Sequence, residues 1–247
     1  MYEADIDAAS PSDRSALRAA AVSGLLYVLL VFVPQVDGPP VETASAAQIR
    51  SFLAENDTGL RASATAGALS IALVLVFTVS LARLIRRRSA ASPLADLVVV
   101  GGALVALWRW LVVAGTSMTL VQALDGTDLA SVDNATLRSW YGLTNFTHLF
   151  ADLGMVAMAT VMAATSMAGL RTGLFPRLAN WLGLIFATGG AVGTAGITSA
   201  WGPLSNVWFI GIFGWWVWSF VLAVTCARRL RSGARSATSG AALSPAA

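Results

Sequence analysis

Six long apolar segments constrain the fold of this chain more than any other feature. They cover residues 16–33, 62–85, 94–124, 146–170, 178–200 and 207–227. An α-helix rises 1.5 Å per residue, so about 20 residues cross the roughly 30 Å hydrocarbon core of a membrane. Only 12% of the 247 residues are charged, about half the share in an average soluble domain. The sequence therefore predicts an all-α, polytopic transmembrane six-helix bundle.

The ends of the chain are expected to lie outside the bundle. We predict a tail at 1–15, a six-helix transmembrane domain at 16–231 and a disordered tail at 232–247, which is rich in Ser, Ala and Gly. An acid-rich leader precedes residues 16–33, and no small-residue cleavage site follows them. The first segment is therefore interpreted as a span and not as a signal peptide.

The arginines predict the orientation. Three of the sixteen, Arg50, Arg61 and Arg138, fall on one side of the predicted membrane, and Arg109 lies inside a span. The other twelve fall on the opposite side: Arg14, Arg18, Arg83, Arg86, Arg87, Arg88, Arg171, Arg177, Arg228, Arg229, Arg231 and Arg235. Basic residues concentrate on the cytoplasmic side of membrane proteins, so both termini are predicted to be cytoplasmic, in a multi-pass protein of a bacterial inner membrane. We expect the arginines to meet anionic lipid headgroups and not nucleic acid.

Several chemistries are excluded by missing residue types. The chain has no Lys, one His and one Cys, which removes Schiff-base chemistry, a P-loop, an internal disulfide and a cysteine-held iron–sulfur cluster. No HExxH or GxSxG motif is present. We therefore expect no cofactor and no metal site, and the sequence leans against an enzyme. A Ser–His pair brought together by the fold is still open.

Two charges lie deep inside predicted spans: Arg109 in 94–124 and Asp152 in 146–170. Counted from the span ends, Arg109 lies about 18 Å and Asp152 about 20 Å from the inner boundary. We predict that the two side chains face each other. Either the pair only fixes the register of two helices, or Arg109 contacts an anionic ligand in an outward-facing cavity.

His148 lies one helical turn before Asp152, and Met155 continues the same face. This stripe is a candidate for a proton relay or a ligand set, against the alternatives of a hydrogen-bonded core His and a gap-filling Met. Trp108 and Trp110 flank Arg109 about 100° to either side. We therefore expect one of the two rings to pack against a neighbouring helix and the other to meet lipid.

Packing is predicted where small residues meet bulky ones. Gly189 and Gly193 form a GxxxG motif in 178–200, and aromatic residues fill 207–227. Such a motif serves close helix contact, either within the chain or in a homo-oligomer.

The outer loop after the first span contains a predicted amphipathic helix over 43–55, with Ile49, Phe52 and Leu53 on one face. That helix would be a lid or a packing connector. The second outer loop, 125–144, is predicted to be an acidic loop.

Short motifs resemble a bacterial family. They are Leu17-Arg18-Ala19 with Gly24-Leu25-Leu26-Tyr27, the run Asn56-Asp57-Thr58-Gly59-Leu60-Arg61-Ala62, and Gly173-Leu174-Phe175-Pro176-Arg177 with Trp181-Leu182-Gly183. The pattern resembles a large family of six-span integral membrane proteins known only as a domain of unknown function. The resemblance implies the architecture and no reaction. We therefore predict a non-enzymatic accessory, sensor or structural bundle, with a small transporter or lipid- or anion-binding protein that uses Arg109 as the alternative.

Overall fold

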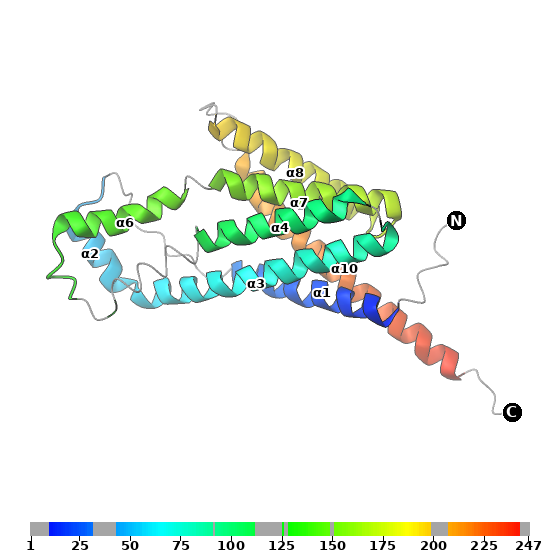
Figure 1. Cartoon of the computed structure of the whole chain (residues 1–247). Helices are drawn as coiled ribbons and strands as arrows, with labels where there is room; N and C mark the ends of the chain where they lie inside the picture. The colour runs from blue at the N-terminus through cyan, green and yellow to red at the C-terminus, as the bar shows by residue number, and fades with distance from the viewer. Residues whose placement is uncertain are drawn as a thin grey trace.

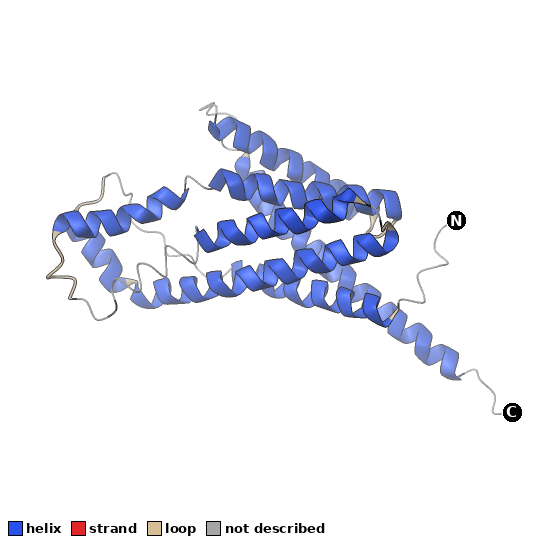
Figure 2. Ribbon diagram, viewed as in Figure 1, coloured by secondary structure: helices blue, strands red, loops and turns tan. Residues whose placement is uncertain are grey.

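The computed structural model describes residues 10–31, 43–90, 92–111, 125, 128–148, 151–198 and 207–242. Within these ranges the chain is helical and contains no strand (Figure 2). The helices are α1 (Pro11–Val31), α2 (Ala46–Glu55), α3 (Asp57–Arg88), α4 (Pro93–Arg109), α6 (Asn134–His148), α7 (Ala151–Thr172), α8 (Arg177–Thr198) and α10 (Trp208–Ala242).

Helices α1, α3, α4, α7, α8 and α10 pack as a closed circuit. Each contacts the next one along the chain, and α10 returns to α1 (Figure 1). At one end of the circuit α7 and α8 are joined by a short turn. There Gly173 adopts a φ of 66°, which an L side chain rarely tolerates, and Pro176 precedes the first residue of α8, a position where its missing N–H costs nothing.

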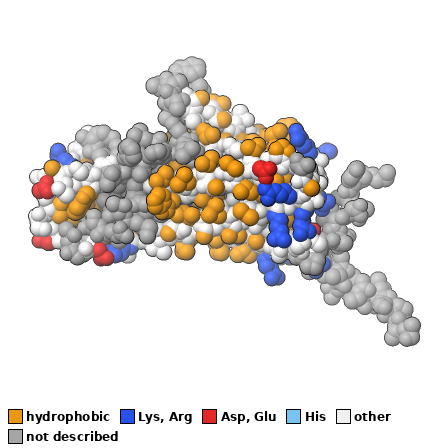
Figure 3. All heavy atoms as spheres, viewed as in Figure 1, with side chains coloured by type: hydrophobic (Ala, Val, Ile, Leu, Met, Phe, Trp, Pro, Cys, Tyr) orange, Lys and Arg blue, Asp and Glu red, His pale blue; other side chains and the backbone are white. Residues whose placement is uncertain are grey.

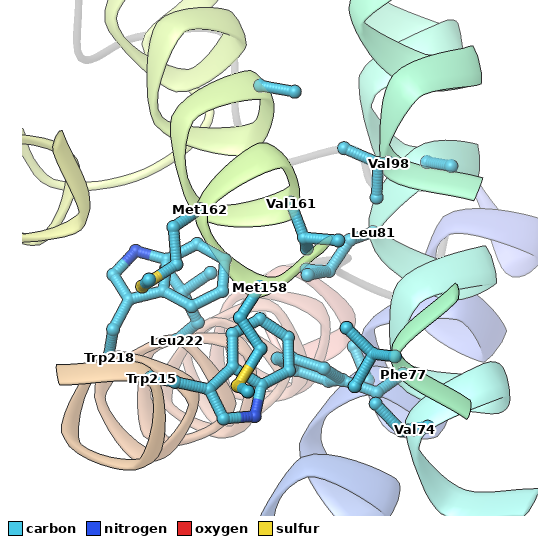
Figure 4. Close-up of a cluster of buried hydrophobic side chains, with 14 of the residues drawn as sticks. Val74, Phe77, Leu81, Val98, Met158, Val161, Met162, Trp215, Trp218 and Leu222 are labelled. Carbon is cyan, nitrogen blue, oxygen red and sulfur yellow. The ribbon is translucent and has the colours of Figure 1, made fainter. Parts of the chain in front are cut away.

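The interior of the circuit is apolar. All six helices of the circuit contribute side chains to it. Those labelled in Figure 4 come from α3, α4, α7 and α10 and are Val74, Phe77, Leu81, Val98, Met158, Val161, Met162, Trp215, Trp218 and Leu222. Trp215 Nε1 donates a hydrogen bond to the hydroxyl of Tyr27, 2.9 Å away, so this buried polar pair is satisfied. Burial of apolar side chains on one face of each helix is what the helical periodicity of the sequence predicts.

Four helices are long and apolar enough to cross a membrane in the part of the chain that the structure describes. The candidate spans are Ser12–Val31, Asp57–Arg88, Arg177–Ala195 and Trp208–Ser232, which lie in α1, α3, α8 and α10. They match the first, second, fifth and sixth predicted segments. The third predicted segment is described only as far as residue 111, and its remainder, 112–124, lies outside the described residues.

Helices α2 and α6 form a separate outer pair, at the end of the molecule opposite the two termini (Figure 1). The amphipathic helix predicted over 43–55 is confirmed as α2, which begins with a capping box between Ser45 and Gln48. Ile49 and Leu53 are buried against Leu137 and Tyr141 of α6. This small core is distinct from the core of the bundle.

The predicted second outer loop, 125–144, contains a helix that the sequence does not predict, because α6 begins at Asn134. Asp133 caps this helix: its carboxylate accepts hydrogen bonds from the backbone N–H groups of Ala135 and Thr136 at 3.0 and 2.9 Å. Leu137 and Tyr141, four residues apart, then bury one narrow stripe against α2. Mostly polar residues surround that stripe in the sequence, so it was not recognised as a helix. The helix that corresponds to the fourth predicted segment, 146–170, is α7, which begins at Ala151.

The C-terminal prediction also differs from the structure. A disordered tail was expected from residue 232, whereas α10 continues to Ala242. Residues 232–242 include three Ser, one Thr and two Gly, so their composition alone does not favour helix. They extend a helix that is already anchored in the bundle, so no new nucleation is needed.

Candidate functional site

Arg109 is the buried cation at the junction of α3, α4 and α7. The residue is 4% exposed although it lies at the end of α4. Its Nε donates a hydrogen bond of 3.0 Å to the hydroxyl of Ser70 on α3. Ser70 is fully buried and donates its own proton to the carbonyl of Gly67, 2.7 Å away. The Ser70 oxygen is thereby oriented to accept from Arg109.

Trp108 packs beside this guanidinium. The Cζ atom of Arg109 lies 5.9 Å from the centroid of the Trp108 ring, within range of a cation–π contact. The Trp108 ring also lies against Gly154 of α7, where an added Cβ would collide with the indole. Trp110 is 53% exposed. Trp108 therefore packs against a neighbouring helix, as the sequence predicts for one of the two rings, and contact of Trp110 with lipid stays a prediction.

The register of α4 and α7 bears on the predicted pair of Arg109 and Asp152. Gly101 of α4 lies against Val161, and Trp108 lies against Gly154, so the two helices are antiparallel. One further residue along α4 reaches Arg109, and the residues of α7 just before Gly154 lie at that level. The backbone of residue 152 therefore lies about level with Arg109. The side chains of Asp152 and His148 lie outside the described residues, so their pairing and the proton relay stay predictions.

The described part of the junction has more hydrogen-bond donors than acceptors. A guanidinium carries five N–H donors, and among the described residues Arg109 bonds only to Ser70 and forms no ion pair. The indole Nε1 of Trp108 is also buried and has no partner within these residues. Within the described residues, the buried guanidinium of Arg109 and the unbonded N–H of the adjacent Trp108 indole fit an acceptor that carries negative charge.

Met155 belongs to a different contact. It is buried, and its methyl group fills the space between Gly190 of α8 and Gly211 of α10, where an added Cβ on Gly211 would collide with it. Gly154, one residue earlier, faces α4 instead. Met155 therefore acts as a packing side chain between α8 and α10, and the structure does not bring it to Arg109.

The two glycines of the GxxxG motif lie against α10 of the same chain. Gly189 contacts Ile210, and a Cβ on Gly193 would collide with the backbone of Trp208. Large residues of α10 thus fill the surface that the small residues of α8 leave open. The outward face of α8 is apolar instead, and it exposes Leu178, Trp181, Ile185 and Val192.

The contacts of two polar residues at these sites, Ser70 and Arg50, are not predicted by the sequence. Ser70 is one of several hydroxyl residues in its segment, and only its contact with Arg109 distinguishes it. Arg50 of α2 clamps the segment before α6: its Nε donates to the carbonyl of Leu129 at 3.0 Å, and its guanidinium also bonds to Asn134 at 2.8 Å and to the carbonyl of Val132. No periodic pattern in the sequence marks either contact.

Local contacts shift the pKa values of two groups in the outer pair. Hydrogen bonds from Thr136 lower the pKa of Asp133 below its ordinary value of 3.8. Burial raises the pKa of Tyr141. Among the residues that the structure describes, no three His, Cys, Asp or Glu side chains gather as a metal site.

Comparison of the chain with protein-family models, with curated proteins and with solved structures gave no match. The family resemblance drawn from the short motifs therefore stays a prediction.

Proposed function

We propose that the chain is a six-span protein of a bacterial inner membrane, with α4 and α7 as the two spans beyond the four apolar candidates. Both helices pack between those candidates in the same circuit. Both also expose apolar side chains to the surroundings, Leu97, Val100 and Leu107 from α4 and Val156 and Met167 from α7. Exposed apolar side chains of this size on a packed helix fit contact with lipid.

The charges support the proposed orientation. Arginine side chains gather at the end of the bundle near the termini (Figure 3), where Arg83, Arg86, Arg87 and Arg88 end α3. The outer pair, α2 and α6, lies at the opposite end. The positive-inside rule then places both termini in the cytoplasm.

Within this architecture we assign the protein a non-enzymatic role, as a structural, accessory or sensor bundle. The observation that carries the assignment is the buried Arg109, bonded to Ser70 and level with residue 152. A charge in this position is costly in a membrane unless it is paired. An ion pair with Asp152 would satisfy it and would tie α4 to both α3 and α7.

This role is tested by neutralising the pair. Arg109→Leu and Asp152→Leu should each reduce the yield of folded protein, and the double variant should recover it, because both buried charges are then removed together. If the double variant is worse than either single variant, Arg109 and Asp152 do not act as a pair.

The second candidate is a small transporter or anion-binding protein, and the buried Arg109 beside a Trp108 indole N–H that has no partner within the described residues favours it. Carboxylate and phosphate are the groups that a guanidinium binds best. Mass spectrometry of the lipids and metabolites that co-purify with the protein tests this candidate. An anion that is present in the unmodified protein and lost in Arg109→Leu supports it, and identical profiles would sink it.

A further inference from the structure

Two polar atoms in the interior of the bundle have no hydrogen-bond partner among the described residues. They are Ser166 Oγ of α7 and Trp218 Nε1 of α10. Ser166 is 0% exposed and Trp218 is 1% exposed. Burial of an unpaired polar group in an apolar interior is costly, and buried polar groups of folded proteins are nearly always hydrogen-bonded. Both atoms therefore call for a bonding partner.

The two atoms meet at a single position, Gly183 of α8. A Cβ added to Gly183 would collide with Ser166 Oγ and with Trp218 Nε1, so both atoms lie beside the same backbone carbon. They are consequently close to each other, although no hydrogen bond joins them. Three helices thus bring two unpaired polar atoms to one point inside the bundle.

Ser166 differs from other hydroxyl residues of the same helix. Thr160 and Thr172 of α7 each donate to the backbone carbonyl four residues earlier, those of Val156 and Ala168, at 2.8 Å. Such a bond satisfies a hydroxyl within its own helix. Ser166 makes no bond of this kind, and its oxygen lies against α8 instead. Its hydroxyl is therefore available to a ligand between the helices.

We propose that Ser166 and Trp218 bind one water molecule beside Gly183. The indole N–H can only donate, whereas a hydroxyl both donates and accepts, so a water oxygen can bond to both atoms. Neither side chain is charged, which fits a neutral ligand, and the close approach of α8 at Gly183 limits its size. Buried waters commonly join polar groups that lack other partners.

The water would connect α7 to α10 where α8 packs over both. This site is inside the bundle, so it does not depend on which side of the membrane the termini occupy. Failure of the site and failure of the proposed topology are therefore separate results.

The test compares two tryptophans of α10 in the unmodified protein. Trp215 is also fully buried, and its ring centroid lies 5.7 Å from that of Trp218. Its Nε1, however, donates to the hydroxyl of Tyr27 at 2.9 Å. Nuclear magnetic resonance of the full chain in detergent, with ¹⁵N-labelled tryptophan, measures magnetisation transfer from water to each indole N–H. The variants Trp215→Phe and Trp218→Phe assign the two signals.

We expect transfer from water at Trp218 and little at Trp215. Because each indole lies near a hydroxyl, a signal relayed through an exchanging hydroxyl proton would appear at both rings. Equal transfer at the two rings, or none at Trp218, would overturn the proposal. This comparison needs no substitution at the site, so it holds even if a site variant fails to fold.

A variant and its matched control complete the test. Ser166→Ala removes one hydrogen bond to the water and should weaken the transfer at Trp218 about fivefold, with Trp215 unchanged. Thr160→Ala removes a hydroxyl that is already bonded to Val156 and should leave both signals unchanged. A signal at Trp218 that is the same in Ser166→Ala as in the unmodified protein would contradict a water held by Ser166.

Discussion

Two arginines that are wholly or partly buried, Arg50 in the outer pair and Arg109 in the bundle, differ in how many hydrogen-bond acceptors the fold supplies to them. Arg50 finds three oxygen acceptors on a single segment, at Leu129, Val132 and Asn134. Arg109 is more deeply buried, yet Ser70 is its acceptor among the described residues. A guanidinium whose N–H groups are hydrogen-bonded within the fold, like that of Arg50, has a structural role. Arg109, to which the described residues supply one acceptor, has room for a further partner, either Asp152 or an anion.

The largest expected effect separates these two arginines directly. Arg109→Leu leaves a buried carboxylate without its partner if Asp152 is paired, and the loss in the free energy of unfolding should be about 3–5 kcal/mol. Denaturant unfolding followed by tryptophan fluorescence measures it. Arg109→Lys keeps the charge and should lose less. A loss below about 1 kcal/mol for Arg109→Leu would contradict a buried pair.

The bundle and the outer pair also differ in how closely their glycines are packed. Gly154→Ala places a methyl group against the Trp108 ring, and we expect a loss of about 1–3 kcal/mol from overpacking. Gly142→Ala in α6 meets open space and should stabilise that helix by up to about 1 kcal/mol. Unfolding of both variants is measured under the same conditions. Equal changes in the free energy of unfolding would show that the contact between Trp108 and α7 is loose.

The Arg50 clamp should affect only the outer pair. Arg50→Ala removes bonds to Leu129, Val132 and Asn134, and hydrogen exchange in α6 should become about tenfold faster, as expected for a loss of roughly 1–2 kcal/mol. Exchange in α3 and α10 should not change. Arg138→Ala, on the exposed surface of α6, is the control. Faster exchange throughout the bundle would mean that the two cores are not independent.

The smallest expected effect depends on pH. The pKa of Asp133 is lowered in the folded protein, first by the hydrogen bond from Thr136. Its contribution to α6 is therefore present above pH 3.8, the ordinary value, and is lost as the pH falls through the lower folded pKa. Exchange of the first amides of α6 should accelerate in that window. Asp133→Asn, which keeps a capping oxygen, should remove the pH dependence, and an unchanged dependence would contradict the role of Asp133.

The sequence predicted the features that depend on local pattern. Long apolar runs predicted α1, α3, α8 and α10, and the spacing of Ile49 and Leu53 predicted α2. It missed α6, because a helix that buries only Leu137 and Tyr141 is stabilised by its partner and not by its own composition. One residue of the site could be predicted and the other could not. Arg109 is recognisable as a charge within an apolar run, whereas Ser70 becomes part of the site only through tertiary packing.

The central claim, six spans with both termini in the cytoplasm, is tested most directly by cysteine accessibility in intact cells. Cys226 is buried and is replaced by Ser, and single cysteines are then placed at three exposed positions: Ala47 in α2, Ser139 in α6 and Ser89 in the turn between α3 and α4. A membrane-impermeant maleimide should label positions 47 and 139 from outside, and position 89 only after the membrane is permeabilised. Labelling of position 89 in intact cells would contradict the account.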